Sequence, residues 1–351
     1  MKFSHETLPQ RVVFASGEAP AAVAAEIEAL GGSKVLLIAS AREAALAEPI
    51  AAQLPVVLRH DEVVMHVPVE VAERARQAAV ASGADVIVTV GGGSTTGLGK
   101  AVAMTTGLPI VAVPTTYAGS EATNVWGLTE GETKTTGVDN RVLPASIVYD
   151  AELLTTLPGE MTVASGLNAM AHCVDSMWGP RADPIDRALA QEGIAGLAAG
   201  LPEVKADSAG IDGIERTLYG AYLAAVSFAS AGSGMHHKIC HVLGGMFNLP
   251  HAQTHAVVLP HVLAFNAPNA PEAERRIAQA FGSATAGQGL ARLRAQLDAP
   301  RALKDYGMPE DGIARAIAPI KAAIPADNPT PVSEENLTTL LRAAWSGHGQ
   351  S

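Results

Sequence analysis

The chain has 351 residues, a hydrophobic fraction of 48% and a formal net charge of −11 at pH 7. That length is ample for two domains with buried cores, so neither disulfides nor a structural metal is required for stability. The negative charge and the lack of clustered Lys and Arg argue against a nucleic-acid-binding protein, although a local positive pocket can still bind a small anion.

Targeting and membrane signals are absent from the sequence. The N-terminus MKFSHETLPQRVVF has no apolar run after its charges, and no later stretch holds about 18 uncharged apolar residues. Cys173 and Cys240 are the only cysteines, and their apolar, helix-like surroundings favour two buried thiols over a disulfide. We expect a cytoplasmic protein that binds neither membrane nor nucleic acid.

The first half alternates short apolar runs with alanine-rich helical segments. The apolar runs lie at 35–40, 84–90, 109–114 and 146–150, and the helical segments at 19–30, 41–52 and 70–82. Apolar strands without polar alternation, separated by helices, are typical of a parallel sheet covered on both faces. We predict that residues 1–157 form a Rossmann-like, doubly wound α/β domain that binds a dinucleotide.

A glycine triplet, Gly91 to Gly93, follows the second of these runs and precedes Ser94 and a helical segment. Glycines let backbone N–H groups approach a diphosphate, and a helix N-terminus favours its charge. The triplet alone is equally consistent with a tight turn that binds nothing. It matches neither GxGxxG nor a Walker loop, because Ala101 follows Gly99-Lys100 where Ser or Thr is required.

Two further loops bear on the cofactor. The strand ending Ile38-Ala39-Ser40-Ala41-Arg42 contains no carboxylate to repel a 2′-phosphate, and Ser40 and Arg42 offer groups that can accept one. We therefore predict use of both NADH and NADPH. The loop PTTYAGSE at 114–121 presents hydroxyls suited to a nicotinamide ribose, or simply to capping the loop.

The second half reads as helical throughout. Segments with a period of 3.6 residues lie at 161–179, 184–199, 211–231, 234–246, 252–266, 271–281, 288–297, 309–323 and 333–346. The α/β pattern ends near Leu157-Pro158. We predict that residues 158–351 form an α-helical substrate-binding and catalytic domain, with a cleft between the two domains.

Histidines concentrate between residues 236 and 261, where six of the chain's eleven occur. His237 and His241 stand at i and i+4 on a helix face, and His251 and His255 repeat that spacing. Asn168 and His172 make a third such pair on an earlier helix. Neutral imidazoles at this spacing suit metal binding or proton transfer, and incidental core histidines are the alternative.

Taken together, these motifs resemble the iron-containing alcohol dehydrogenase family, and within it the maleylacetate reductases. The resemblance covers nearly the whole chain, and its carriers are GGGS at 91–94, PTTYAGSEAT at 114–123, KTTGVDNRVLPASIVYD at 134–150, GLNAMAHCVD at 166–175 and HHKICHVLGGMFNLPH at 236–251. It implies a dinucleotide-binding domain, a helical domain, hydride transfer in the cleft between them, and a homodimer, for which RVVFASG at 11–17 is the candidate interface.

Roles follow residue by residue from the matching motifs. The cofactor diphosphate would contact Gly92, Gly93 and Ser94, and the nicotinamide ribose side would contact Thr115, Thr116 and Lys134. The metal ligands of metal-dependent members fall on Asn168, His172, His237 and His251. His241 matches a histidine that lies near the nicotinamide and the substrate.

Three departures from the family pattern point to catalysis without metal. Asn168 stands where metal-dependent members have Asp, and an amide brings no negative charge to a divalent ion. Gly97 replaces an acidic residue, and PTTYAGSE is one residue shorter than the commoner form. All three departures resemble maleylacetate reductases. We therefore expect no metal; if one is bound, its ligands are His172, His237 and His251.

The implied reaction is NAD(P)H-dependent reduction of the conjugated C=C bond of maleylacetate, a dicarboxylate, to 3-oxoadipate in the degradation of aromatic compounds such as resorcinol or hydroxyquinol. His241 or His251 would be the general acid, and His172 and His237 would bind anionic oxygens of the substrate. Asn168, Tyr117 and Lys238 are further candidates for substrate contacts.

Three alternatives stay open at this point. One is a metal-dependent alcohol or polyol dehydrogenase of the same family. A second is a lyase or cyclase resembling dehydroquinate synthase, in which no net NAD(P)H is consumed. The third is a non-catalytic dinucleotide sensor or a histidine-rich metal-storage protein.

Overall fold

The computed structural model describes residues 1–131 and 133–347, apart from the side chains of residues 133 and 134. The chain divides into two compact units, Leu8–Leu157 and Met1–Thr7 together with Pro158–Ser351. The placement of residues 1–7 differs from the predicted range 1–157. Those residues belong with the helical unit because His5 binds there, its Nδ1 lying 2.9 Å from Oδ2 of Asp183.

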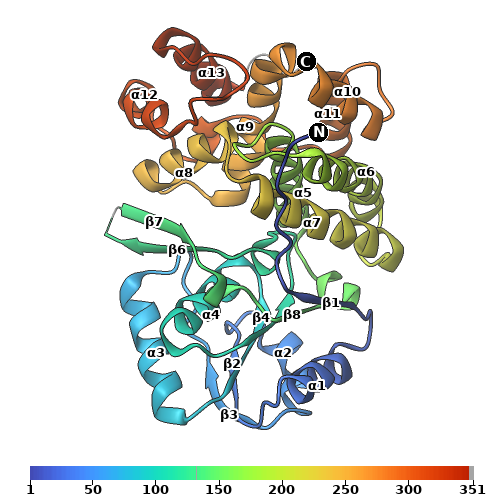
Figure 1. Cartoon of the computed structure of the whole chain (residues 1–351), viewed down its shortest axis with the longest axis vertical. Coiled ribbons are helices and arrows are strands. Elements are labelled where there is room, and N and C mark those ends of the chain that lie inside the picture. Colours follow the sequence, from blue (N-terminus) through green and yellow to red (C-terminus); the bar gives the residue numbers. More distant parts are fainter. Residues whose placement is uncertain (132, 348–351) are drawn as a thin grey trace. The chain divides into compact units, whose positions relative to one another are not determined.

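The α/β unit is built on a six-stranded sheet in the order β1-β8-β5-β4-β2-β3 (Figure 1). All neighbouring strands in it run parallel. Its strands are β1 (Arg11–Phe14), β2 (Val35–Ile38), β3 (Val56–His60), β4 (Val86–Gly91), β5 (Ile110–Pro114) and β8 (Ser146–Tyr149). The predicted fold class, a doubly wound parallel sheet followed by an α-helical domain, is confirmed.

Helices cover both faces of this sheet. Helices α1 (Ala19–Ala29) and α2 (Ala44–Ala51) pack on the face to which Val86, Val88 and Val90 of β4 point. Helices α3 (Val69–Ser82) and α4 (Gly93–Thr106) pack on the face of Ile87. Because successive side chains of a strand point to opposite faces, a strand buried between two helical layers must be apolar at every position.

The strands that the sequence did not predict are those with partly exposed side chains. β1 and β3 are the two edges of the sheet, and β3 alternates between half-buried and exposed residues. The other two, β6 (Val125–Glu130) and β7 (Thr133–Val138), form a separate antiparallel ribbon. A criterion based on continuous apolar runs detects only strands buried on both faces.

The helical unit matches the predicted segments to within a few residues, except that one helix extends to Ala206 rather than 199. The helices are α5 (Gly159–Ser176), α6 (Pro184–Ala206), α7 (Ile211–Ala231), α8 (Met235–Phe247), α9 (His251–Asn266), α10 (Pro271–Ala280), α11 (Ala286–Leu297), α12 (Gly312–Ala323) and α13 (Glu334–Ser346). Cys173 and Cys240 are buried free thiols, as expected.

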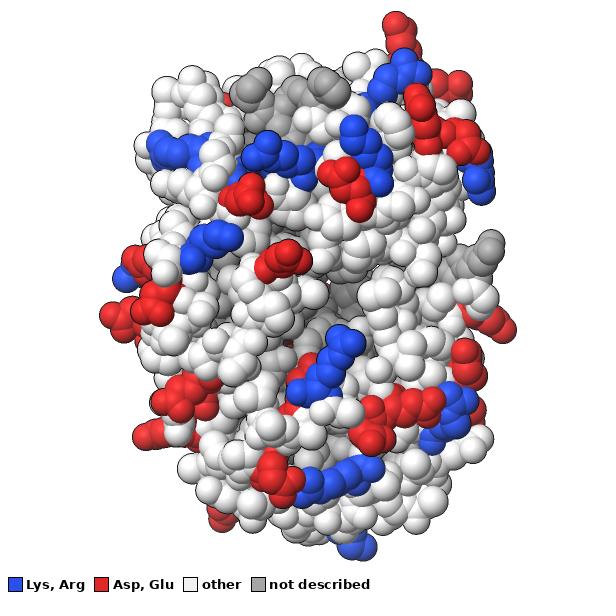
Figure 2. All heavy atoms as spheres, turned by 180° about the vertical axis from the view of Figure 1, so that it is seen from behind, with Lys and Arg blue, Asp and Glu red and all other residues white. Residues whose placement is uncertain are grey.

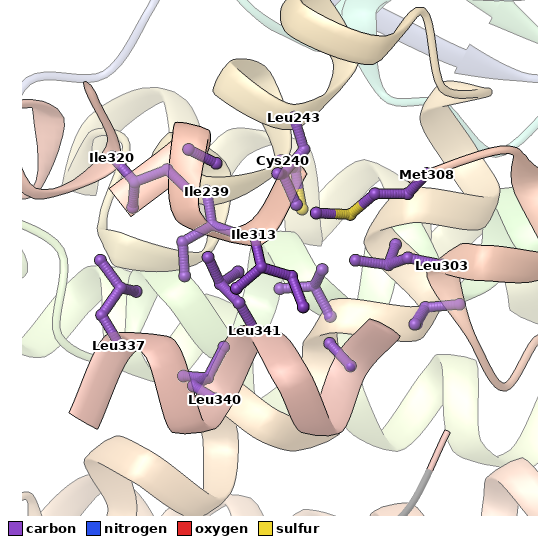
Figure 3. Close-up of a cluster of buried hydrophobic side chains, with 14 of the residues drawn as sticks. Ile239, Cys240, Leu243, Leu303, Met308, Ile313, Ile320, Leu337, Leu340 and Leu341 are labelled. Atoms are coloured by element: carbon purple, nitrogen blue, oxygen red, sulfur yellow. The ribbon is translucent and has the colours of Figure 1, made fainter. Parts of the chain in front are cut away.

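A cluster of buried aliphatic side chains holds α8 in place. Ile239 and Leu243 of α8 pack with Ile313 of α12 and with Leu337 and Leu341 of α13 (Figure 3). The apolar residues of α8 alternate in sequence with its histidines. Packing of the apolar face therefore also fixes the direction in which the histidines point.

Two surface properties bear on possible partners. Over the described residues, no helix has both the length and the apolar character needed to cross a membrane. On the face shown in Figure 2, acidic and basic side chains are interspersed over the surface rather than gathered into a basic patch.

The packing of α4 on β4 gives a stability prediction. A Cβ at Gly99 would stand 2.5 Å from Cγ2 of Thr89, a contact that real side chains do not make. We expect Gly99→Ala to lower the free energy of unfolding by about 1–3 kcal/mol, because an overpacked core must shift. Denaturant unfolding followed by circular dichroism measures this.

Gly287→Ala is the matched control. Gly287 lies in α11, and a Cβ added there would meet no atom within 4 Å. That change should be neutral or stabilising by up to about 1 kcal/mol. Equal stability of the two variants would contradict the close approach of α4 to β4.

Candidate functional site

The glycine loop lies at the switch point of the sheet. β2 and β4 are neighbours, but β2 leads through α2 to β3 on one side, whereas β4 leads through α4 to β5 on the other. Their two helices cover opposite faces. The chain therefore diverges at the carboxyl ends of β2 and β4, which is where open α/β sheets bind ligands.

The local geometry of this loop suits a diphosphate. Gly92 is the N-cap of α4, and no side chain caps the helix, so its first N–H groups are available to an anion. A Cβ at Gly92 would stand 3.0 Å from Cγ2 of Thr116. Gly91, at φ 155°, has no room for a side chain either, because Oγ1 of Thr95 would be 2.3 Å from its Cβ. The residues present therefore fit a dinucleotide.

The loop after β5 lies against the glycine loop. The N–H of Thr115 donates to the carbonyl of Gly91 over 3.2 Å, and Thr116 is the neighbour of Gly92 already noted. The structure thus brings together the residues predicted to bind the diphosphate and those predicted to bind the nicotinamide ribose. Lys134 lies on β7 opposite Thr129, but its side chain is outside the described residues.

A carboxylate stands beside Ser40 that the sequence analysis did not take into account. The hydroxyl of Ser40 donates to Oε2 of Glu43, the residue immediately preceding α2. The prediction of both cofactors rested on the absence of a carboxylate between Ile38 and Arg42. Glu43 lies just beyond that range, and its side chain folds back to Ser40.

A buried lysine and glutamate support the loop after β5. Nζ of Lys100 donates to the carbonyls of Thr123 and Val125, each over 2.7 Å. Oε1 of Glu121 accepts from the hydroxyl of Tyr149 over 2.9 Å. Burial lowers the pKa of Lys100 to about 7, with Glu121 acting in the opposite direction. Lys100 therefore acts on the shape of this loop, and sequence analysis considered it only as part of a failed Walker match.

Tyr117 is also part of this loop, and its side chain is only 1% exposed. Sequence analysis named Tyr117 as a candidate for substrate contact. Its side chain packs inside the α/β unit, and burial raises its pKa.

The histidines of the helical unit come together as the spacing suggested. The ring centroids of His172 and His237 are 4.9 Å apart and the rings are stacked, at an interplanar angle of 11°. His241 lies 6.0 Å from His237 and 6.3 Å from His251 by ring centroids. One cluster therefore collects imidazoles from α5, α8 and α9.

The remaining predicted residues lie on the same helices. Asn168 is buried one turn before His172 on α5, at 2% exposure. Lys238 follows His237 on α8 and is half-buried. A third i, i+4 relation places His255 one turn after His251, with ring centroids 4.4 Å apart.

Asp175 orients this cluster, and sequence reasoning missed it. Its Oδ2 lies 2.8 Å from Nδ1 of His237, and its carboxylate also accepts from the N–H groups of Gly234 and His236. Asp175 is fully buried. With Nδ1 of His237 held by a carboxylate, Nε2 is the ring atom left for chemistry. Burial raises the pKa of Asp175 to about 6, against these hydrogen bonds.

At the positions of the predicted metal ligands, three buried atoms have no hydrogen-bond partner among the described residues: Oδ1 of Asn168, Nδ1 of His172 and Nε2 of His237. Buried polar atoms are costly unless they meet a partner, so these atoms mark a place for a ligand or water. Burial lowers the pKa of His172 to about 4 and that of His237 well below its usual value, with neighbouring histidines adding to the effect at His237.

The donor set does not fit a catalytic divalent ion well. Asn168 brings no negative charge to an ion, and the carboxylate of Asp175 is engaged with Nδ1 of His237. Over the described chain, His172, His237 and His251 do not bring ligand atoms within 4.8 Å of one another. A tetrahedral zinc site holds its ligand atoms about 3.4 Å apart.

A second histidine layer lies behind the first. Nε2 of His236 is 2.9 Å from Nδ1 of His255, and Sγ of Cys240 is 3.6 Å from the same nitrogen of His236. All three side chains are buried. Because one imidazole donates to the other, this layer constrains the tautomers and ring planes within the cluster.

Known protein families match both units. The model of the iron-containing alcohol dehydrogenases matches residues 9–151, and that of the C-terminal part of the Fe-containing alcohol dehydrogenase family matches residues 162–345. A maleylacetate reductase of Sphingobium indicum is 44% identical, with 99% of this chain and 98% of the relative covered. Maleylacetate reductase 2 of Cupriavidus pinatubonensis is 47% identical, at 97% and 95% coverage.

Solved structures agree with this assignment. An iron-containing alcohol dehydrogenase of Corynebacterium glutamicum has 60% identity and a TM-score of 0.98, covering 100% of this chain and 98% of that chain. A maleylacetate reductase of Agrobacterium tumefaciens has 39% identity and a TM-score of 0.93, covering 99% of each chain. The resemblance stated from the motifs is confirmed, and the chain belongs to the iron-containing alcohol dehydrogenase family.

Proposed function

We propose that this protein is a maleylacetate reductase that uses NADH or NADPH and needs no catalytic metal. The proposed reaction is supported by relatives named maleylacetate reductase that are at least 40% identical to this chain and align with it over nearly their whole length. The observation that supports the metal-free part is the uncharged amide of Asn168 beside the histidines, with the carboxylate of Asp175 engaged at Nδ1 of His237.

The reduction requires the protein to stabilise a developing negative charge and to supply a proton. When bound, the nicotinamide supplies a hydride to the substrate carbon β to the ketone. Negative charge then develops on the ketone oxygen, and the adjacent carbon needs a proton. A hydrogen-bond donor aimed at that oxygen and a positioned acid meet both needs without a metal.

The histidine cluster is suited to these roles. We assign the proton donor to His241 or His251, which lie on α8 and α9 with ring centroids 6.3 Å apart. We assign His172 and His237 to the anionic oxygens of the substrate. His237 would do so as an imidazolium, donating from Nε2 to the substrate while its Nδ1–H faces Asp175. Asp175 holds the His237 ring by Nδ1, so that the orientation of this ring is set before substrate arrives.

The glycine loop and the loop after β5 would hold the cofactor. Backbone N–H groups of Gly93 and Ser94 at the start of α4 would receive the diphosphate. Thr115 and Thr116 would line the nicotinamide ribose, and Lys100 would keep their loop in shape through the carbonyls of Thr123 and Val125.

The direct test is maleylacetate with NADH or NADPH, with and without chelator. We expect stoichiometric loss of reduced cofactor absorbance and an unchanged rate after chelation and dialysis, with less than about one metal per ten active sites by elemental analysis. Loss of the rate on chelation, restored by added Fe²⁺ or Zn²⁺, would establish the metal-dependent alternative. Product formation without net cofactor oxidation would favour a lyase.

Substitutions in the histidine cluster test the assigned roles. We expect His251→Ala and His241→Ala each to lower kcat/KM by about 10²-fold or more, the usual contribution of a general acid. Asn168→Ala should have a smaller effect, because it removes only one neutral contact. All three variants should keep the cofactor affinity of the parent protein, measured by fluorescence titration. A requirement for Asn168→Asp before activity appears would overturn the metal-free account.

Glu43 should influence the choice between the two cofactors. A carboxylate at the end of β2 hydrogen-bonds a ribose 2′-OH and repels a 2′-phosphate. We expect Glu43→Gln to raise the ratio of kcat/KM for NADPH to that for NADH by about tenfold, equivalent to roughly 1.4 kcal/mol. Glu48→Gln, also on α2 but paired with Arg59 at the surface, is the control and should leave the ratio unchanged. An unchanged ratio in both variants would place the ribose elsewhere.

A further inference from the structure

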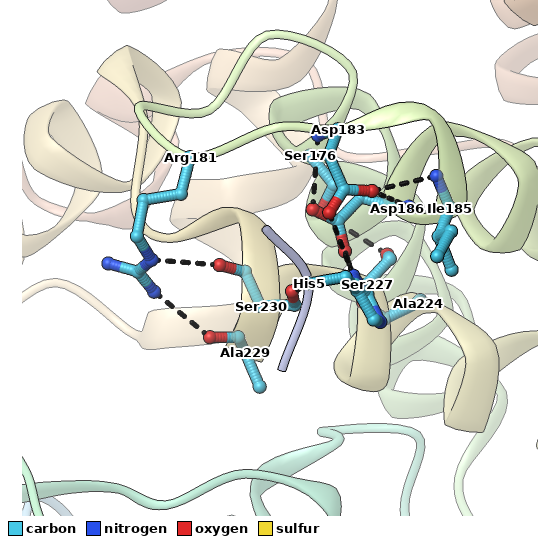
Figure 4. Close-up of polar contacts among 10 residues, drawn as sticks. All are labelled: His5, Ser176, Arg181, Asp183, Ile185, Asp186, Ala224, Ser227, Ala229 and Ser230. Carbon is cyan, nitrogen blue, oxygen red and sulfur yellow. Dashed lines mark hydrogen bonds and ion pairs between the residues drawn. The ribbon is translucent and has the colours of Figure 1, made fainter. Parts of the chain in front are cut away.

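A buried cluster of charged side chains lies away from the histidines assigned to catalysis. It consists of His5 from the N-terminal segment and of Asp183 and Asp186 at the start of α6 (Figure 4). Nδ1 of His5 lies 2.9 Å from Oδ2 of Asp183 and 3.6 Å from Oδ1 of Asp186. All three ligand atoms lie within 4.8 Å of one another.

The capping box of α6 sets the direction of both carboxylates. Oδ1 of Asp183 accepts from the N–H groups of Ile185 and Asp186, and Oδ2 of Asp186 accepts from the N–H of Asp183. One oxygen of each carboxylate is therefore hydrogen-bonded at the helix terminus. The other two oxygens, Oδ2 of Asp183 and Oδ1 of Asp186, both face His5, and the helix terminus holds them there.

The charge of this cluster is unbalanced. Asp183 is 4% exposed and Asp186 is fully buried. Among the described residues, no Lys or Arg forms an ion pair with either carboxylate. The nearby Arg181 instead donates to the carbonyls of Ser230 and Ala229. Two buried carboxylates thus face one imidazole, which supplies at most a single positive charge.

One oxygen in the cluster also lacks an ordinary hydrogen bond. Within the described chain, Oδ1 of Asp186 has no partner of normal hydrogen-bond geometry. Burial raises the pKa of Asp186, and a hydrogen bond with the Ser230 hydroxyl opposes that shift. The hydroxyl of Ser230 lies 3.4 Å from Nδ1 of His5, so a third oxygen borders the same space.

We propose that His5, Asp183 and Asp186 bind a divalent transition-metal cation, which ties the N-terminal segment to α6. A divalent ion would balance the two carboxylates, and one imidazole nitrogen with two carboxylate oxygens is a ligand set that suits Zn²⁺. The ligand-atom separations of 2.9 and 3.6 Å bracket the roughly 3.4 Å of a tetrahedral zinc site. His5 is 12% exposed, which gives an ion access from solvent.

This site is separate from the proposed reaction. Its residues are not among those assigned to substrate or cofactor, and an ion here would stabilise the fold without taking part in hydride or proton transfer. The hard ion Mg²⁺ prefers six oxygen ligands and retains water, so it should bind much more weakly than Zn²⁺.

The test uses the full chain, stripped of metal by chelation and dialysis. Zn²⁺ is titrated by isothermal calorimetry, and thermal unfolding is followed with and without Zn²⁺ at about 100 times its Kd. We expect one ion bound per chain at this site and a rise in Tm of about 3 °C or more, since a ligand at that excess stabilises the folded state. Mg²⁺ should give no such rise.

Variants locate the ion. His5→Ala and Asp186→Asn should each lose the Zn²⁺-dependent rise in Tm and weaken binding by about tenfold or more. Asp186→Asn retains an oxygen for the N–H of Asp183, so the helix start is preserved. His251→Ala, in the histidine cluster, should keep the full rise. A rise that survives in His5→Ala but disappears in His251→Ala, or no Zn²⁺ binding by the parent chain, would overturn the proposal.

Discussion

The arrangement of the histidine cluster depends on one buried carboxylate. Asp175 of α5 accepts hydrogen bonds from the first N–H groups of α8 and holds Nδ1 of His237 at 2.8 Å. Helix α8 has no cap of its own, because its N-cap is Gly234. A Cβ at Gly234 would stand 2.5 Å from Oδ1 of Asp175, so only glycine allows the carboxylate this close. The helix terminus also favours the negative charge of Asp175.

The contact between Asp175 and His237 connects the packing of α8 with the orientation of its histidines. The aliphatic face of α8 packs against α12 and α13, which fixes the rotation of the helix. Asp175 then fixes the His237 ring on the other face and leaves Nε2 directed away from the carboxylate. The same carboxylate would support a metal ligand in a metal-dependent relative, since an imidazole that donates one N–H to a carboxylate is a better base at its other nitrogen. Here the neighbouring position is the neutral Asn168, so the imidazoles remain but the compensating charge does not.

Much of the fold and of the histidine cluster could be predicted from the sequence, and the features that could not have identifiable physical causes. The central strands were recognisable because burial on both faces makes every position apolar, as in β4. The pairing of His237 with His241, and of His251 with His255, was recognisable because helical periodicity is local. Edge strands β1 and β3 were missed because their side chains are partly exposed.

Contacts between residues distant in sequence left no local signal. Asp175 meets His237 across 62 positions, and Lys100 reaches Thr123 and Val125 in another element. His5 reaches Asp183 across 178 positions, so the grouping of the N-terminal segment with the helical unit could not be read from composition. Glu43 was overlooked for a different reason: it lies one residue beyond the segment considered, and its side chain turns back to Ser40.

The central claim is that Asn168 and the histidine cluster bind an anionic substrate where a metal would otherwise lie. A crystal structure with reduced cofactor and an unreactive dicarboxylate analogue, recorded at wavelengths that give anomalous signal for iron and zinc, tests it most directly. The account predicts carboxylate oxygens of the analogue within hydrogen-bond distance of His172 and of Nε2 of His237, and no anomalous peak among the histidines. An anomalous peak coordinated by His172, His237 and His251, with the analogue bound to it, would contradict the account.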